Sequence, residues 1–195
     1  GQDIEHSSLT NLIGVNLIVE VIVSGKHYLI LQQQSMYNDV NGNRFVPSAS
    51  GSLDRRDYKA FREHKDDDFQ TLLQYGMYRE LQEECYVDVK RYANTYFQLL
   101  GCARLMSKAG KPDFFAKLEI RLSNETELED MLARYDICQN AFVGRKKELE
   151  SNKMVIVDKE DFLWPAHKKA SSIDSVLSPQ LRYVKYLLQE ESKKA

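Results

Sequence analysis

The sequence predicts an α/β/α sandwich built around a mixed β-sheet. Apolar runs suited to strands alternate along the chain with segments of helical periodicity, and a proline-started amphipathic segment lies near the end. At 195 residues and 43% hydrophobic composition, the chain is long enough to bury one substantial core. We therefore expect a single domain over residues 1–195, with its core at about 13–160 and a last helix at about 178–190.

The predicted strands follow the apolar runs in chain order. Ser24-Gly25-Lys26 is a turn signal between two such runs, at 13–23 and 27–33, which indicates a β-hairpin. A polar loop at 38–43 then leads to a strand at 44–49. The remaining expected strands lie at 95–106, 113–122 and 154–157.

The predicted helices are read from apolar residues at helical spacing. Asn124 or Ser123 is a candidate cap for a helix at 125–135, and Ser178-Pro179 is typical of a helix start. An earlier helix leads into residues 79–84, and its apolar face consists of Phe69, Leu72, Leu73, Gly76 and Met77. The stripe that docks the last helix on the core consists of Leu181, Val184, Leu187 and Leu188.

Composition argues against several functional classes. The net charge of −2 gives no basic signal for nucleic acid, and no apolar run is long enough to span a bilayer. The first residues are polar and acidic, unlike a signal peptide. Cys85, Cys102 and Cys138 are odd in number and widely spaced, which fits neither a disulfide framework nor a CxxC metal site. We expect a cytoplasmic protein with neither nucleic acid nor membrane as its partner.

The hexapeptide Arg79-Glu80-Leu81-Gln82-Glu83-Glu84 carries the most specific chemistry. Glu80, Glu83 and Glu84 stand at i, i+3 and i+4, so they share one helical face, and this face continues the apolar one. Carboxylates on a packing face repel one another and are costly to desolvate, and a cation offsets both costs. Carboxylate oxygens without nearby His or Cys favour Mg²⁺ or Mn²⁺. The alternative is an ordinary solvated helix surface.

These residues resemble the Nudix box, whose pattern is G-x5-E-x7-R-E-U-x-E-E-x-G-U with U aliphatic. The second half of the pattern is matched by Arg79, Glu80, Leu81, Glu83, Glu84 and Val87. Gly51-Ser52-Leu53-Asp54 resembles the glycine turn that opens the box. About fourteen residues are inserted between Asp54 and Asp68, and Tyr86 replaces the glycine of the pattern, so the helix exit is expected to differ. The first Glu has no aligned equivalent, and residues 66–68 are candidates for a helix-start role.

The resemblance implies a Nudix-like sandwich fold and a role for each matched residue. Glu83 and Glu84 would bind Mg²⁺ or Mn²⁺, Glu80 would be a further ligand or the base, Arg79 would hold Glu80, and the Gly51 backbone would complete the ligand set. The implied reaction is hydrolysis of a diphosphate linkage in a nucleoside diphosphate linked to another moiety. The partner would be a small-molecule nucleotide, and a homodimer fits the family.

The inserted segment at 55–65 is dense in charges of both signs. One hypothesis makes it a lid in which Arg55, Arg56 and Arg62 contact substrate phosphates. The alternative is a solvent-exposed surface segment without a role in binding.

The sequence is compatible with two other functions. The first is a Nudix-like ligand-binding or regulatory domain that has lost turnover, which the missing first Glu and Tyr86 permit. The second is an enzyme resembling isopentenyl-diphosphate isomerase, for which Cys102 is the one candidate catalytic cysteine in the strand region. Activity that depends on Glu84 separates an enzyme from a binder. Phosphate release, as opposed to double-bond migration, separates a hydrolase from an isomerase.

Overall fold

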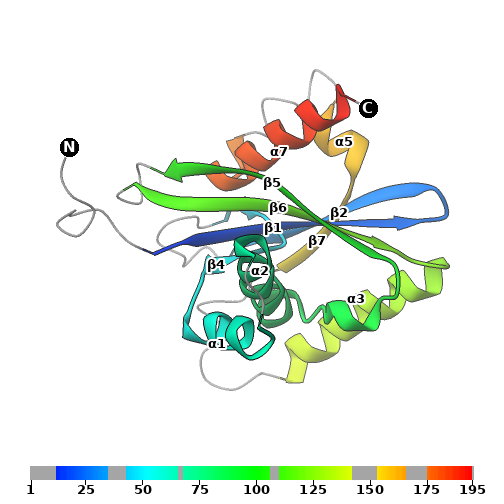
Figure 1. Cartoon of the computed structure of the whole chain (residues 1–195). Helices are drawn as coiled ribbons and strands as arrows, with labels where there is room; N and C mark the ends of the chain where they lie inside the picture. Colours follow the sequence, from blue (N-terminus) through cyan, green and yellow to red (C-terminus); the bar gives the residue numbers. More distant parts are fainter. Residues whose placement is uncertain are drawn as a thin grey trace.

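The structure is a computed structural model that describes residues 12–34, 43–65, 68–105, 110–141, 153–165 and 175–194. Within these residues, a seven-stranded sheet lies between two layers of helices (Figure 1). The strands are β1 Gly14–Val23, β2 Lys26–Gln33, β3 Phe45–Val46, β4 Ala49–Ser52, β5 Thr95–Leu105, β6 Lys111–Arg121 and β7 Lys153–Asp158. The helices are α1 Arg55–Glu63, α2 Phe69–Cys85, the 3₁₀ helix η2 Val89–Arg91, α3 Glu125–Ala141, α5 Lys159–Leu163 and α7 Pro179–Ser192.

The sheet is mixed, as predicted. Its main order is β3-β2-β1-β6-β5, with β4 paired to β1 and β7 paired to β2. Strand β1 is parallel to β6 and antiparallel to β2 and β4, and the β1–β2 hairpin is confirmed. Because β1 has neighbours along its length and helices over both faces, nearly all of its residues are buried. Strand β1 therefore fixes the position of β4, which carries the glycine turn.

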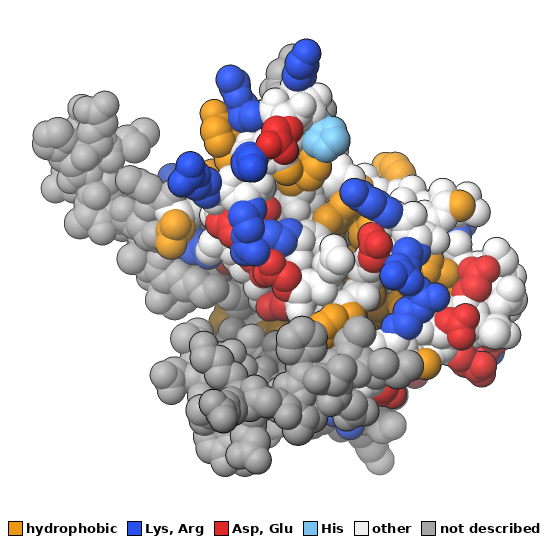
Figure 2. Space-filling view, turned by 90° about the horizontal axis from the view of Figure 1, so that it is seen from below, with side chains coloured by type: hydrophobic (Ala, Val, Ile, Leu, Met, Phe, Trp, Pro, Cys, Tyr) orange, Lys and Arg blue, Asp and Glu red, His pale blue; other side chains and the backbone are white. Residues whose placement is uncertain are grey.

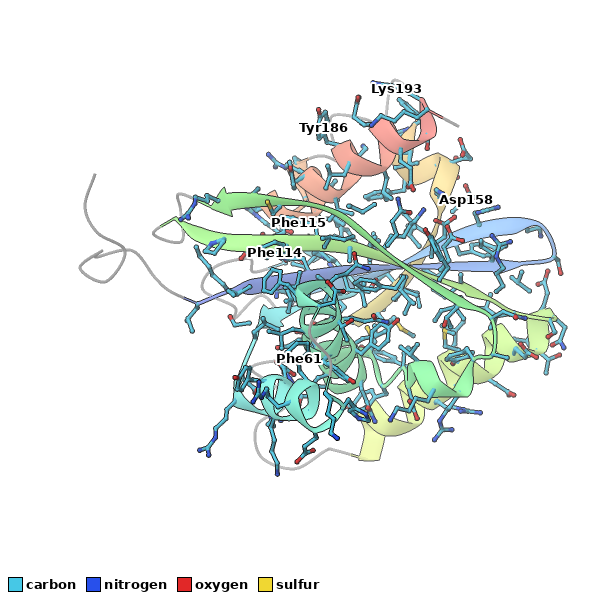
Figure 3. The ribbon with its side chains drawn as sticks, in the orientation of Figure 1. Phe61, Phe114, Phe115, Asp158, Tyr186 and Lys193 are labelled. Carbon is cyan, nitrogen blue, oxygen red and sulfur yellow. The ribbon has the colours of Figure 1, made fainter. Side chains whose placement is uncertain are left out.

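The two faces of the sheet carry separate apolar cores. Along β6, Phe114 packs with the core on the α2 side, and Phe115 packs with the core under α7. The Phe114 ring centroid is 5.4 Å from that of Phe69 on α2, and the Phe115 centroid is 4.9 Å from that of Tyr183 on α7. Figure 3 labels this pair of phenylalanines on β6. The period-two alternation therefore fixes which β6 side chains face α2 and which face α7.

The expected strand at 44–49 is wrong in detail, because it is divided into β3 and β4. Pro47 lacks the backbone N–H that a continuous ladder needs. The next residue, Ser48, accepts a hydrogen bond from Val19 N at 2.7 Å and donates one to the Ile30 carbonyl at 2.6 Å. Its hydroxyl group thus replaces ladder contacts between β1 and β2, and the chain turns to begin β4 beside β1.

The inserted segment forms helix α1, which its mixed charges do not indicate. Asp54 caps it by accepting hydrogen bonds from the backbone N–H groups of Arg56 and Asp57. Asp57 in turn accepts one from Asp54 N at 2.9 Å, which completes a reciprocal capping box. The segment is therefore a defined helix against α2.

The exit of α2 keeps the geometry that a glycine would give. Tyr86 is the C-cap, with φ 56° and ψ 23°, which is the left-handed conformation. The expectation that the exit differs is therefore wrong: the residue differs and the backbone does not. A non-glycine residue is costly in this region. The Tyr86 ring packs 6.1 Å from that of Tyr135 on α3, and this contact offsets part of the cost.

Among the helices that the structure describes, none combines the length and hydropathy needed to cross a membrane.

Candidate functional site

Two acids of α2 are fixed to two residues of β4 by matched spacing. Glu84 Oε2 accepts a hydrogen bond from Ser50 N at 2.9 Å, and Glu80 accepts one from the Ser52 backbone. Four residues of helix rise about 6 Å, and two residues of strand span about 6.8 Å. The i, i+4 acids of the helix therefore align with the i, i+2 backbone N–H groups of the strand.

Gly51 lies between these two anchoring points, and its lack of a side chain makes room for Glu80. A Cβ atom at Gly51 would overlap the Glu80 carboxyl group. The Glu80 carboxyl group therefore lies directly against the bare backbone of the strand at Gly51.

Replacing Gly51 with alanine is expected to displace Glu80 and weaken Mn²⁺ binding by roughly 10–100-fold, the usual effect of misplacing a ligand. The measurement is a Mn²⁺ titration followed by electron paramagnetic resonance. Gly101→Ala is the matched control, because a Cβ there meets its nearest atoms at an ordinary 3.7 Å or more. Equal Mn²⁺ affinity in both variants would contradict the role of Gly51.

Arg79 makes five hydrogen bonds that join β4, α1 and α2. Nε and Nη2 bind the two oxygens of Asp57 at 2.8 and 3.0 Å, and Nη2 also binds the Ser52 carbonyl at 2.9 Å. Nη1 binds Glu80 at 2.9 Å and Glu83 at 3.2 Å. The bond to Asp57 above all raises the pKa of Arg79. Arg79 therefore contacts Glu80, and its N–H donors are all engaged by these partners.

Asp57 is the residue of this cluster that the sequence reasoning missed. It is 2% exposed, and it is the acid that anchors Arg79. A signal was present in the chain, because Asp57 is six residues after Gly51, which is the G-x5-E spacing with aspartate in place of glutamate. The insertion follows this acid and does not replace it. Of the residues at 66–68, Asp68 is the N-cap of α2, and the other two lie outside the described residues.

Among the three arginines proposed for the lid, the structure brings Arg56 to the acids of α2. Arg56 Nη1 lies 2.9 Å from Glu83 Oε1, and its Nε and Nη2 bind Asp54 Oδ2 at 2.8 and 2.7 Å. Arg55 and Arg62 lie on exposed positions of α1. Figure 2, which shows this side of the molecule, has Lys and Arg side chains gathered beside Asp and Glu. Glu83 is therefore held between two guanidinium groups.

A buried polar group lies behind Glu84. Gln32 Nε2 is 3.2 Å from Glu84 Oε2, 2.6 Å from the Ser48 carbonyl and 3.2 Å from Cys85 Sγ. Gln32 is fully buried on β2, at a position where strand alternation calls for an apolar side chain. A polar residue at an apolar position of the strand was therefore the feature of the sequence that could have identified Gln32. Burial raises the pKa of Glu84 to about 8 and that of Cys85 to about 12.

The backbone N–H and C=O groups of successive β4 residues point alternately toward β1 and toward α2. This alternation decides which carbonyl faces the carboxylates. In an antiparallel pair, the N–H and C=O of one residue point to the same side. Ser50 and Ser52 direct their N–H groups to α2, and the Ser52 carbonyl binds Arg79 accordingly. The Ser50 carbonyl therefore lies on the α2 side, and the Gly51 carbonyl is directed toward β1. This geometry favours Ser50 over the predicted Gly51 as a backbone oxygen ligand.

The donor chemistry of this site fits a hard divalent cation. Glu80, Glu83, Glu84 and the Ser50 carbonyl are all oxygen donors. Burial raises the pKa of both Glu80 and Glu84, and the charge of Glu83 raises both further, whereas Arg79 lowers the pKa of Glu80. In the part of the chain that the structure describes, no three Asp, Glu, His or Cys side chains already converge on one point. Glu80 and Glu83 are turned toward Arg79, so binding would require their side chains to turn.

The sequence matches no protein-family profile and no curated protein. Several solved structures match most of the chain at low identity. The Deinococcus radiodurans protein DR0079 is 12% identical, over 95% of this chain and 90% of its own, with a TM-score of 0.49. The Ap4A hydrolase of C. elegans is 14% identical, over 94% and 99%, with a TM-score of 0.46. The Nudix hydrolase RenU of M. smegmatis is 7% identical, over 93% and 86%, with a TM-score of 0.47.

Proposed function

We propose that this protein is a Nudix-type hydrolase that cleaves a diphosphate linkage in a nucleoside diphosphate joined to another moiety, with Mg²⁺ or Mn²⁺. The observation that supports it best is the fixing of Glu80 and Glu84 to Ser52 and Ser50, on either side of the bare Gly51. A solvated helix surface does not need acids hydrogen-bonded to a strand backbone. This arrangement instead places the carboxylate oxygens of Glu80 and Glu84 beside the backbone of β4, where they could serve as cation ligands once the side chains turn.

Glu80, Glu83, Glu84 and the Ser50 carbonyl would hold the cation. When bound, Mg²⁺ or Mn²⁺ neutralises charge on the phosphoryl oxygens and lowers the pKa of a water molecule. Glu84 is oriented by Ser50 N and Gln32, and Glu80 by Ser52 and Arg79. Glu80 is assigned as ligand or as the group that accepts a proton from the attacking water. Arg79 fixes its orientation and does not contact substrate.

The test is phosphate release from a panel of nucleotide sugars, dinucleoside polyphosphates, ADP-ribose, NAD and nucleoside triphosphates, with phosphatase coupling. We expect turnover of at least one compound with Mg²⁺ or Mn²⁺, its loss on chelation with EDTA and its recovery when metal is restored. Turnover that persists in EDTA would contradict the metal-dependent mechanism. Binding of a nucleotide without turnover of any compound would favour a regulatory domain.

The regulatory domain is the second candidate, and one observation favours it. Arg79 and Arg56 already occupy oxygens of Glu80 and Glu83 at 2.9–3.2 Å, as in a site whose acids serve a structural role. The isomerase alternative gains no such support. Cys102 lies exposed on β5, where its carbonyl accepts a hydrogen bond from Tyr183.

A further inference from the structure

Lys111 contacts β4 from the face opposite to the carboxylates. Lys111 and Asp113 lie on β6 with the same alternation as Phe115, so they face α7. Lys111 Nζ is 2.7 Å from Ser52 Oγ and 3.4 Å from the Gly51 carbonyl oxygen. The ammonium group therefore reaches the same two residues of β4 that Glu80 contacts from the α2 side.

Gly14 is what allows Lys111 to reach across the sheet. Strand β1 lies between β6 and β4, and Gly14 is the register partner of both Asp113 and Ser52. A Cβ atom at Gly14 would overlap the Asp113 carboxyl group and the Lys111 side chain. The absence of a side chain at Gly14 therefore leaves room for the Lys111 side chain to cross β1 and reach β4.

Asp113 carries a buried oxygen that needs explanation. The residue is 1% exposed, and its Oδ1 atom has no hydrogen-bond partner. Lys111 Nζ is 3.8 Å from this oxygen, which is an ion-pair distance and not a hydrogen bond. Leaving a buried acceptor unsatisfied is costly. The lysine is thus attracted to Asp113 while its ammonium group stays at the edge of β4.

A diphosphate beside the carboxylates of α2 would need positive charge close to its phosphate oxygens. The five hydrogen bonds of Arg79 go to protein groups, and Arg56 is bound to Asp54 and Glu83. Lysine offers a compact charge with three donors, which suits phosphate oxygens.

We infer that Lys111 is a substrate-contacting residue that binds a phosphate oxygen where the diphosphate lies along the Gly51–Ser52 edge, and that Asp113 is its positioning residue. The inference rests on the proposed function, because it requires a diphosphate beside the carboxylates of α2. It adds a contact from outside the 79–84 motif and from the other face of the sheet.

The test measures binding of α,β-methylene-ADP and of inorganic pyrophosphate, each with Mg²⁺, by isothermal titration calorimetry. Lys111→Met is expected to weaken binding by about tenfold or more, the effect of losing one charge-assisted hydrogen bond. Lys111→Arg is expected to restore much of the affinity. Because Lys111→Met leaves the Asp113 charge buried, the double variant Lys111→Met/Asp113→Asn tests the same loss without that charge. Mn²⁺ affinity is expected to be unchanged in all three.

Lys117→Met is the matched control, since Lys117 lies on the same strand and face but is held by Glu191 at 2.9 Å and Glu119 at 3.1 Å. Probe affinity in this variant should equal that of the native chain. Unchanged affinity in the folded double variant, or no binding of either probe to the native chain, would overturn the inference. Where a substrate is found, an unchanged KM in Lys111→Met would overturn it and leave hydrolysis standing. Lysine-dependent probe binding without turnover would support it and contradict hydrolysis.

Discussion

Replacing Glu84 with glutamine is expected to reduce metal-dependent turnover by more than about 100-fold. Loss of a residue that only orients a metal ligand costs roughly 10–100-fold, so loss of a ligand charge should exceed that range. Glutamine keeps the size of the side chain and an oxygen for Ser50 N, whose bond to Glu84 is 2.9 Å long. The fold should therefore remain intact. The measurement is phosphate release with the best compound of the substrate panel, at saturating Mg²⁺ or Mn²⁺.

Glu63→Gln provides the matched control for this prediction. Glu63 is an exposed acid on α1 whose ion pair, with Lys59 at 3.6 Å, lies on the helix surface. The same chemical change there should leave turnover within about twofold, since surface pairs contribute little. Retained turnover in Glu84→Gln would contradict the assignment of Glu84 as a ligand. Equal losses in both variants would indicate a general effect of charge.

The sequence was sufficient to place the three acids on one helical face, but not to identify their partners on the strands. Helical periodicity alone places Glu80, Glu83 and Glu84 on one face, because the local geometry of a helix is independent of the rest of the fold. Ser50 and Gln32 come from two separate strands, and their approach to Glu84 depends on how the sheet is ordered. No local pattern encodes that order. The acids could therefore be predicted because they lie on one helix. The groups that orient them could not, because they are brought to the helix only by the tertiary structure.

The inserted segment shows a different limit of sequence reasoning. Its mixed charges suggested a solvent-exposed surface segment or a lid. Charge density alone does not show which hydrogen bonds the charged side chains make. In the structure, Asp54 and Asp57 use their side chains to cap α1, and Asp57 then pairs with Arg79. Asp57 lies in the charged segment at 55–65, and Asp54 directly precedes it. Their role depends on which backbone groups they reach, and only the packing of α1 on α2 decides that.

Replacing Asp57 with asparagine is expected to lower the free energy of unfolding by about 3–5 kcal/mol, the usual cost of breaking a buried ion pair from one side. The two oxygens of Asp57 accept hydrogen bonds from Arg79 Nε and Nη2 and from Asp54 N. Asparagine turns an amide N–H₂ group toward one set of these donors, so the charge of Arg79 is left partly uncompensated. Urea denaturation of the two proteins at neutral pH gives the difference.

Asp54→Asn is the internal control, since it makes the same change three residues away on the same turn. Asp54 is 37% exposed, and asparagine caps a helix about as well as aspartate, so the expected loss is much smaller than that for Asp57. A large loss for Asp57 and a small one for Asp54 would mean that the segment before the insertion is part of the same structural unit as Arg79. Equal small losses would contradict this, because the Arg79 guanidinium would then be oriented by Glu80, Glu83 and the Ser52 carbonyl alone.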